Sequence, residues 1–245
     1  MSIIRQPLQM TVKSYPAAPK ALALQAPTSG QVAVYSASAI NGSGGSANLS
    51  LLRKLNYTKR KIYQKAGAVV TEVTTALDAG TATAFLTLIN DAIFVGSKDP
   101  FGFVGFNVST AIGAGSTITY TYYNGTSFVT LNTFEVTGFG ATGTKYVIFA
   151  PPVDWAVGGI VGTDLTLYYI KIIDTVAPAT PVSFNEFWAA EMLAWAEAVA
   201  DNNGLSVESI GEHKPLVLDQ GEGLMPYFSV NANLNLFKAA YNLNS

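Results

Sequence analysis

The side chains that could perform chemistry are few, and their spacing is not typical of a catalytic site. His213 is the only histidine, and the chain has no cysteine. One histidine cannot supply a multi-histidine zinc site, and without cysteine there are no thiolate ligands and no disulfides. A general base at His213 would need an orienting acid and a nucleophile, and Glu212 is poorly placed for that role on a strand. We therefore predict a loop histidine.

Pairs of carboxylates could also do acid–base chemistry. Asp154, Asp164 and Asp174 lie at expected loop edges, but the sequence brings no two of them to the separation that glycoside hydrolysis requires. We expect them to act as turn and cap residues. Segment 219–223 loosely resembles a calcium loop but lacks the ligand spacing. With no phosphate-binding loop and no nucleophile elbow, we predict no catalytic residue, no metal and no cofactor.

The basic residues are concentrated at the beginning of the chain. Nine of the 14 lysines and arginines occur in the first 71 residues, which contain no acid, whereas all 16 acids follow from Glu72 onward. This separation predicts a positive segment that docks on a negative partner, which could be another copy of the chain. The predicted partner-binding residues are Arg5, Lys13, Lys20, Arg53, Lys54, Lys59, Arg60, Lys61 and Lys65.

Segment 53–65 is the densest part of this basic region, with Tyr57 and Tyr63 between its charges. Such a mixture could bind a nucleic acid backbone and stack bases. The overall pI of about 5.4 argues against a dedicated nucleic-acid protein. The pattern therefore favours an acidic protein surface as the partner.

The composition is low in charge. Hydrophobic residues make up 49% and charged residues 12%, where about 25% charged is usual. Two explanations remain open: a surface covered by neighbouring molecules, or a well-packed β-protein with a polar, uncharged exterior. No apolar run approaches the roughly 20 residues of a membrane helix, and segment 17–26 is too short and interrupted for a signal peptide. We expect no membrane association.

The segment 51–177 is typical of a β-domain. Alternating, β-branched or aromatic runs recur about every ten residues, between turn signals. Asn124-Gly125 gives a strong hairpin signal, because both positions tolerate positive φ. The expected strands include 92–95, 101–108, 117–123, 127–131, 145–149 and 165–172. Such spacing indicates a sandwich or barrel, and we predict an antiparallel, jelly-roll-like β-sandwich.

Residues 1–50 are expected to form an extended N-terminal arm and linker. Four prolines interrupt any long regular element, and segment 36–46 has the serine, alanine and glycine content of a linker. An arm could reach over a neighbouring subunit. The alternative is a disordered N-terminus.

Residues 178–245 are predicted to contain one amphipathic helix, spanning roughly Phe184 to Asp201. Ser183 and Glu186 have the spacing of a capping box. Large apolar residues then recur at helical spacing: Phe184, Trp188, Met192, Trp195 and Val199. This stripe would pack on the protein's own sheet or anchor a partner. A last short helix is expected around 234–241.

Three stretches carry a resemblance to a known family. They are YYNGTSFVTL at 122–131, FAPPVDW at 149–155 and LYYIKI at 167–172. Their order is similar to a β-domain in structural proteins of tailed bacteriophages, with Phe128 and Lys171 where tryptophan and arginine are usual. The motif residues are Asn124, Gly125, Pro151, Pro152, Asp154 and Trp155. The resemblance implies a virion component and no catalytic residues.

The motif residues also have a physical interpretation. Asn124-Gly125 would close a tight turn and fix the strand register. Pro151-Pro152 would end the preceding strand by removing two donors, and Asp154 could cap the following turn. Trp155 would then fold over the end of the sandwich.

Together these observations predict a non-enzymatic virion protein, assembled in the host cytoplasm. We favour a capsid decoration (cement) protein that binds the major capsid protein, with arms contacting neighbouring subunits and self-association, for example as a trimer. A tail or baseplate protein is the first alternative. A carbohydrate-binding module in a receptor-binding protein is the second, with Tyr120, Tyr122, Tyr123 and Phe128 as an aromatic platform.

Overall fold

A computed structural model describes most of the chain. The described residues are 3–5, 9–15, 24–25, 30–41, 47–55, 60–160, 162–198, 204–207, 216–219, 222–228 and 232–243. The protein is mainly β and divides into two compact units. Unit 1 combines Met1–Asn56 with Met192–Ser245, and unit 2 is Tyr57–Glu191. The expectation of a mainly β, antiparallel protein is confirmed.

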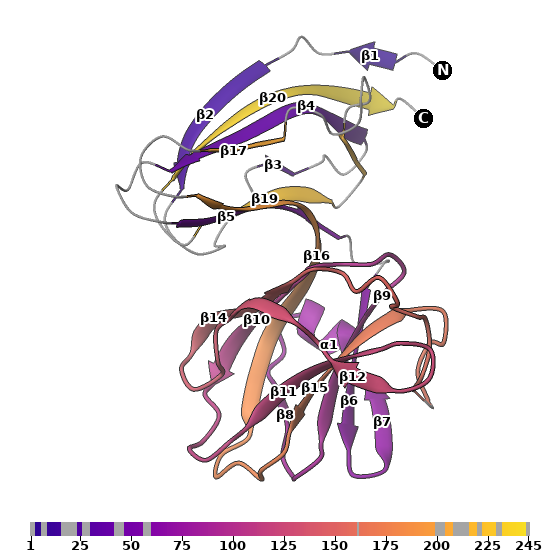
Figure 1. Cartoon of the computed structure of the whole chain (residues 1–245). Helices are drawn as coiled ribbons and strands as arrows, with labels where there is room; N and C mark the ends of the chain where they lie inside the picture. Colours follow the sequence, from indigo (N-terminus) through magenta and orange to yellow (C-terminus); the bar gives the residue numbers. More distant parts are fainter. Residues whose placement is uncertain are drawn as a thin grey trace. The chain divides into compact units, whose positions relative to one another are not determined.

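Unit 2 contains a six-stranded antiparallel sheet, called here the β15 sheet. Its strands follow in the spatial order β12 (Phe128–Thr130), β11 (Ile118–Tyr123), β15 (Tyr168–Asp174), β9 (Ala92–Ser97), β6 (Arg60–Ala66) and β7 (Val69–Glu72). Figure 1 labels each of these strands. Most of these strands match runs of alternating or β-branched residues, and the strands expected at 92–95, 117–123, 127–131 and 165–172 are confirmed with small shifts of their ends.

A second sheet of unit 2, called here the β10 sheet, is built around a buried central strand. Its order is β13 (Thr133–Val136), β14 (Gly143–Phe149), β10 (Phe103–Thr110) and β16 (Val182–Ala198), and β8 (Thr83–Phe85) also pairs with β16. Strand β16 continues past Glu191 into unit 1. The short helix α1 (Thr74–Asp78) follows β7. Within the described ranges, no helix is both long and apolar enough to cross a membrane.

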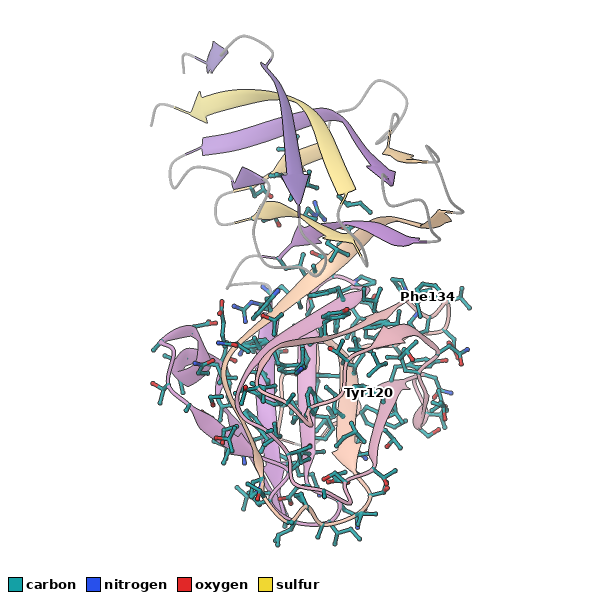
Figure 2. All side chains as sticks on the ribbon, turned by 90° about the vertical axis from the view of Figure 1, so that its left-hand side faces the viewer. Tyr120 and Phe134 are labelled. Carbon is teal, nitrogen blue, oxygen red and sulfur yellow. The ribbon has the colours of Figure 1, made fainter. Side chains whose placement is uncertain are left out.

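Aromatic side chains fill the space between these two sheets. The Arg60 guanidinium of β6 lies 4.0 Å from the centre of the Phe187 ring on β16, so one face of the β15 sheet is turned towards the β10 sheet. Phe106 and Phe184 stack at 4.5 Å. Figure 2 shows Tyr120 among the side chains of unit 2 and Phe134 near its edge, in agreement with the 49% exposure of Phe134. The core of unit 2 is therefore closely packed and rich in phenylalanine.

The helix predicted from Phe184 to Asp201 is wrong, because residues 182–198 form strand β16. Opposite β10, Phe187 pairs with Phe106 and Phe184 with Val108, and the register shifts between them. This bulge places Phe184 and Phe187, three residues apart, on the same face of the sheet. The helical spacing of the aromatic residues is thus produced by a bulged strand, and Ser183 and Glu186 do not form a capping box.

Trp188 lies on the opposite face of β16 from Phe187. It is paired with Gly105 of β10, and a Cβ atom at Gly105 would come within 2.9 Å of the Trp188 ring. The glycine leaves the space that the indole occupies, as aromatic residues commonly do beside strand glycines. Both faces of β16 are buried from Phe187 to Ala190, so this part of the strand has no alternating polar positions.

Unit 1 pairs the two ends of the chain. Strand β4 (Gly30–Asn41) runs antiparallel to β20 (Ala232–Leu243), which also pairs with β1 (Ile3–Arg5) and β2 (Gln9–Tyr15). The remaining strands of the unit are β3 (Leu24–Gln25), β5 (Ala47–Lys54), β17 (Gly204–Val207), β18 (Leu216–Leu218) and β19 (Gly223–Phe228).

This pairing does not confirm the expected extended arm. In residues 1–50, strands β1, β2 and β4 pair with β20, and β3 and β5 pair with β19. Segment 36–41 of the predicted linker is part of β4, and 42–46 lies outside the described residues. The short helix expected at 234–241 is strand β20, whose alternation of leucine and asparagine from 233 to 236 suits a two-residue period.

Candidate functional site

Segments 122–131, 149–155 and 167–172 are connected by hydrogen bonds in unit 2. The Tyr122 hydroxyl donates to Asp154 Oδ1 at 2.8 Å, and the Ala156 backbone N–H donates to the Tyr123 carbonyl at 2.9 Å. The Trp155 indole N–H donates to the Tyr169 carbonyl at 3.1 Å. Segment 154–156 is thereby hydrogen-bonded to both β11 and β15. The motif is one structural feature, although its parts lie up to 47 positions apart in the sequence.

The hairpin predicted at Asn124-Gly125 is confirmed. Asn124 Oδ1 accepts hydrogen bonds from the backbone N–H groups of Thr126 and Ser127, at 3.0 and 2.9 Å. Gly125 has a φ of +94°, which favours glycine. The strands pair at Tyr123 and Phe128, so the connection has four residues rather than the two of the tightest hairpins.

The PPxDW segment follows the sequence interpretation in part. Pro151 and Pro152 follow the end of β14 after one residue, Ala150. Trp155 is 8% exposed and packs against Phe101 at a ring distance of 4.9 Å, which confirms that it folds onto the core. Asp154 does not cap the following turn as predicted, because its carboxylate accepts a hydrogen bond from the Tyr122 hydroxyl. The turn is closed instead by the Trp155 backbone N–H, which donates to the Pro152 carbonyl.

A glycine-containing loop continues from the motif across the β15 sheet. Gly158 and Gly159 have φ values of +87° and +91°. A Cβ atom at Gly159 would lie 2.5 Å from the Tyr123 ring, so only glycine lets the backbone pass so close. Ile160 is 6% exposed and packs in a cluster with Tyr63, Phe94, Leu167 and Tyr169. The loop therefore covers part of the outer face of the sheet, the face turned away from the β10 sheet.

A hollow of about 290 Å³ lies beside this loop on the outer face. Its walls are mostly apolar, and two lysines are its charged residues. The lining residues are Lys65, Ala68, Val70, Phe94, Phe128, Gly159, Ile160 and Lys171. Strand pairing explains the grouping: Lys65 is opposite Ala92, Lys171 is opposite Phe94, and residues opposite each other share a face.

The two lysines of the hollow are Lys65 on β6 and Lys171 on β15, and they differ from Arg60 and Lys61, the other cations of β6. Lys171 is half-buried, and its Nζ lies 5.6 Å from the centre of the Phe128 ring. Burial, followed by repulsion from Lys65, lowers the pKa of Lys171. Among the described residues, no acid forms an ion pair with Lys65 or Lys171. By contrast, Arg60 pairs with Asp78 at 2.8 Å and Lys61 with Glu72 at 3.3 Å. The hollow is thus a site of uncompensated positive charge.

The structure separates the basic residues that the sequence groups together. Arg5 is on β1, Lys13 on β2, and Arg53 and Lys54 on β5, all in unit 1, whereas Lys20 and Lys59 lie outside the described residues. Arg60, Lys61 and Lys65 belong to β6 in unit 2. Arg60 is only 2% exposed, so it stabilises the core and is not on the surface. A partner-binding role of the others stays a prediction.

Two of the three candidate acids, Asp164 and Asp174, act as turn residues. Asp164 accepts from the Thr166 N–H and hydroxyl at 3.0 and 2.6 Å, and these bonds lower its pKa. Asp174 accepts from the Thr117 N–H at 2.8 Å. The turn and cap interpretation is confirmed for both. His213 lies outside the described residues, and within those residues no three metal-ligating side chains gather.

The aromatic platform expected on β11 is divided between two faces. Tyr120 and Tyr122 point the same way, and burial raises the pKa of Tyr120. Tyr123 points the other way, and its ring lies under Gly159. Sequence reasoning missed the hollow. Its one signal is the odd-numbered spacing of Lys61, Tyr63 and Lys65, which predicts a strand face with cations.

The chain matches no protein-family profile and no curated protein sequence.

Proposed function

We propose that this chain is a non-enzymatic structural protein of a tailed-phage virion, with unit 2 as a jelly-roll-like β-sandwich. The observation that carries the proposal is the meeting of the three resembling stretches. Their hydrogen bonds, from Tyr122 to Asp154 and from Trp155 to the Tyr169 carbonyl, make the motif a single element of the fold. A motif whose parts depend on each other is more specific than three independent short similarities.

Within the virion, a capsid decoration protein that binds the major capsid protein is the favoured role. The low charge content of 12% suits a surface that neighbouring molecules cover. Stable protein interfaces bury roughly 1,600 Å² each, and many copies on one shell would together resist its expansion. The contacts would come from surfaces of the folded units, because β1, β2 and β4 are paired with β20, and β3 and β5 with β19, in the same chain.

The test is the position and copy number of the protein in purified particles. Gold-labelled antibodies against the protein should mark the head, and quantitative mass spectrometry should count hundreds of copies. Particles assembled without the protein should release their DNA at a lower temperature. Label on the tail or baseplate with a handful of copies would establish the alternative role, and the absence of the protein from particles would exclude both.

A deletion of residues 1–50 is a poor test of binding. It would remove β1, β2 and β4, which are partners of β20, and so would disturb the fold of unit 1. Substitutions on the surface of a folded chain separate binding from folding more clearly.

A further inference from the structure

We propose that the hollow on the outer face of the β15 sheet binds a small organic anion, with one carboxylate on a compact body that has an apolar face. The inference rests on the hollow alone and does not depend on where the protein is located. Lys65 and Lys171 would hold the carboxylate, and Val70, Phe128 and Ile160 would contact the body.

Both ammonium groups can reach one anion. Lys65 and Lys171 project from the same face of the sheet, with β9 between their strands. Two strand spacings are about 10 Å across the sheet, and the offset from Ala92 to Phe94 adds about 7 Å along it. The two Cα positions are therefore about 12 Å apart, which two lysine stems leaning towards Phe94 can bridge. Lys65 is close enough to lower the pKa of Lys171 by repulsion. An anion placed above Phe94 would therefore face both charges.

The charge of the hollow selects an anion over a neutral ligand. Lys171 is half-buried beside a like charge, a position that disfavours its protonated form. A carboxylate would relieve this repulsion and accept charge-assisted hydrogen bonds. Lys61, also on the outer face, already has Glu72 as its partner at 3.3 Å. The two lysines of the hollow have no such acid among the described residues.

The walls and the volume limit the rest of the ligand. Apolar side chains favour a body with at least one apolar face, such as an aromatic ring or one side of a sugar ring. A volume of about 290 Å³ is at the small end of ligand sites, so one ring would fill it. Two sources share this chemistry: a free aromatic or aliphatic acid, and an acidic sugar residue.

The experiment titrates the full-length protein with four probes, and the NMR chemical shifts of the backbone amides report binding. Benzoate and glucuronate carry the carboxylate, while benzyl alcohol and glucose are their uncharged counterparts. We expect saturable binding of at least one charged probe at millimolar concentration, with shifts at Val70, Gly159 and Ile160. Its uncharged counterpart should bind at least tenfold more weakly. Binding of glucuronate indicates an acidic sugar as the source, and binding of benzoate alone indicates a free acid.

Variants link this binding to the two lysines. Lys171→Met and Lys65→Met retain the apolar stem and should each weaken binding by about tenfold. Lys145→Met makes the same change of charge on β14, outside the hollow, and should leave binding unchanged. Circular dichroism spectra and melting temperatures check that each variant is folded.

Three results would overturn the proposal. The first is the absence of saturable binding of either charged probe. The second is equal binding of charged and uncharged probes, which would show that the lysines have no role. The third is an equal loss of affinity in the Lys145→Met and Lys171→Met variants, which would indicate a nonspecific effect of net charge.

Discussion

The two faces of the β15 sheet use the same strands for different purposes. On the inner face, the side chains of Ile93, Ile170 and Ile172 are completely buried. On the outer face, the alternate positions hold large residues with polar ends, such as Tyr169 and Lys171. The inner face is mainly apolar, with the buried Arg60 as an exception, and the outer face is amphipathic.

The difference shows how one strand can stabilise the fold and carry a site. Because successive side chains point to opposite faces, each strand has an independent set of residues for each role. The outer face is covered only in part, by the loop around Gly159 and Ile160, and the hollow lies where this cover ends. We expect substitutions on the inner face to affect stability and those on the outer face to affect the hollow.

The largest expected effect comes from Ile172→Ala, compared with its neighbour Ile173→Ala. Ile172 is fully buried on the inner face, so truncation should destabilise the protein by about 3 kcal/mol. Ile173 is half-buried on the outer face, so its truncation should destabilise the protein by only about 1 kcal/mol, because water can fill part of the space. Urea unfolding of both variants measures the difference. Equal losses would mean that the two faces are equally buried in solution.

A second substitution, Gly96→Ala, tests the packing of the outer face. The added Cβ would clash with the ring of Tyr169, which is fully buried and whose hydroxyl donates to the Asp164 carbonyl. We expect a loss of about 2 kcal/mol, since the ring must move.

Gly138→Ala is the matched control for this change. No atom lies within 4 Å of its added Cβ, and stability should change little. Thermal unfolding compares the two variants, and an unchanged melting temperature for Gly96→Ala would show that Tyr169 can move freely.

Asp91 makes a smaller, pH-dependent contribution at the start of β9. Burial alone would raise its pKa, but hydrogen bonds from the Gly67 N–H, the Thr87 hydroxyl and the Leu88 N–H lower it. Because the pKa of Asp91 is lower in the folded state, its carboxylate stabilises the protein at pH values above the unfolded-state pKa of 3.8. This stabilisation is lost as the pH falls through the folded-state pKa. The Asp91→Asn substitution should lower the free energy of unfolding by about 1 to 2 kcal/mol at pH 7.

The pH dependence provides the check on Asp91. The difference between the wild-type protein and Asp91→Asn should shrink from pH 5 towards pH 2, as the wild-type carboxyl group becomes protonated. Urea midpoints across this range measure it, and a constant difference would show that the carboxylate charge is not what stabilises the turn.

Sequence patterns predicted the strands of unit 2 best where one residue in two is polar. Segment 117–123 alternates β-branched and aromatic residues, and it forms β11 almost as expected. The pattern failed for β16, because both of its faces are buried and the bulge before Phe187 mimics helical spacing. A run of alanine, leucine and tryptophan with favourable helix propensity then supported the wrong choice.

The candidate site was harder to predict than the strands. Nothing in the sequence indicates that Lys171 lies close to Lys65. Only the register across β9 brings the two lysines to one hollow, and this register depends on two separate pairings, of β6 with β9 and of β9 with β15. The uneven distribution of charge pointed to Lys65 but also to Arg60, which is buried in an ion pair.

The smallest predicted effect is a gain of stability in Lys171→Met. Burial and the nearby Lys65 lower the pKa of Lys171, so its charged form is less favourable in the folded state than in the unfolded one. Methionine keeps the apolar stem and should add about 0.5 kcal/mol at pH 7. As the pH rises past the folded pKa towards the ordinary value of 10.5, the wild-type protein loses this penalty and the difference should shrink. Urea unfolding at pH 7 and above pH 10 measures it. A site that binds anions is expected to retain such a destabilising charge, whereas a loss of stability in the variant would indicate that the lysine supports the fold.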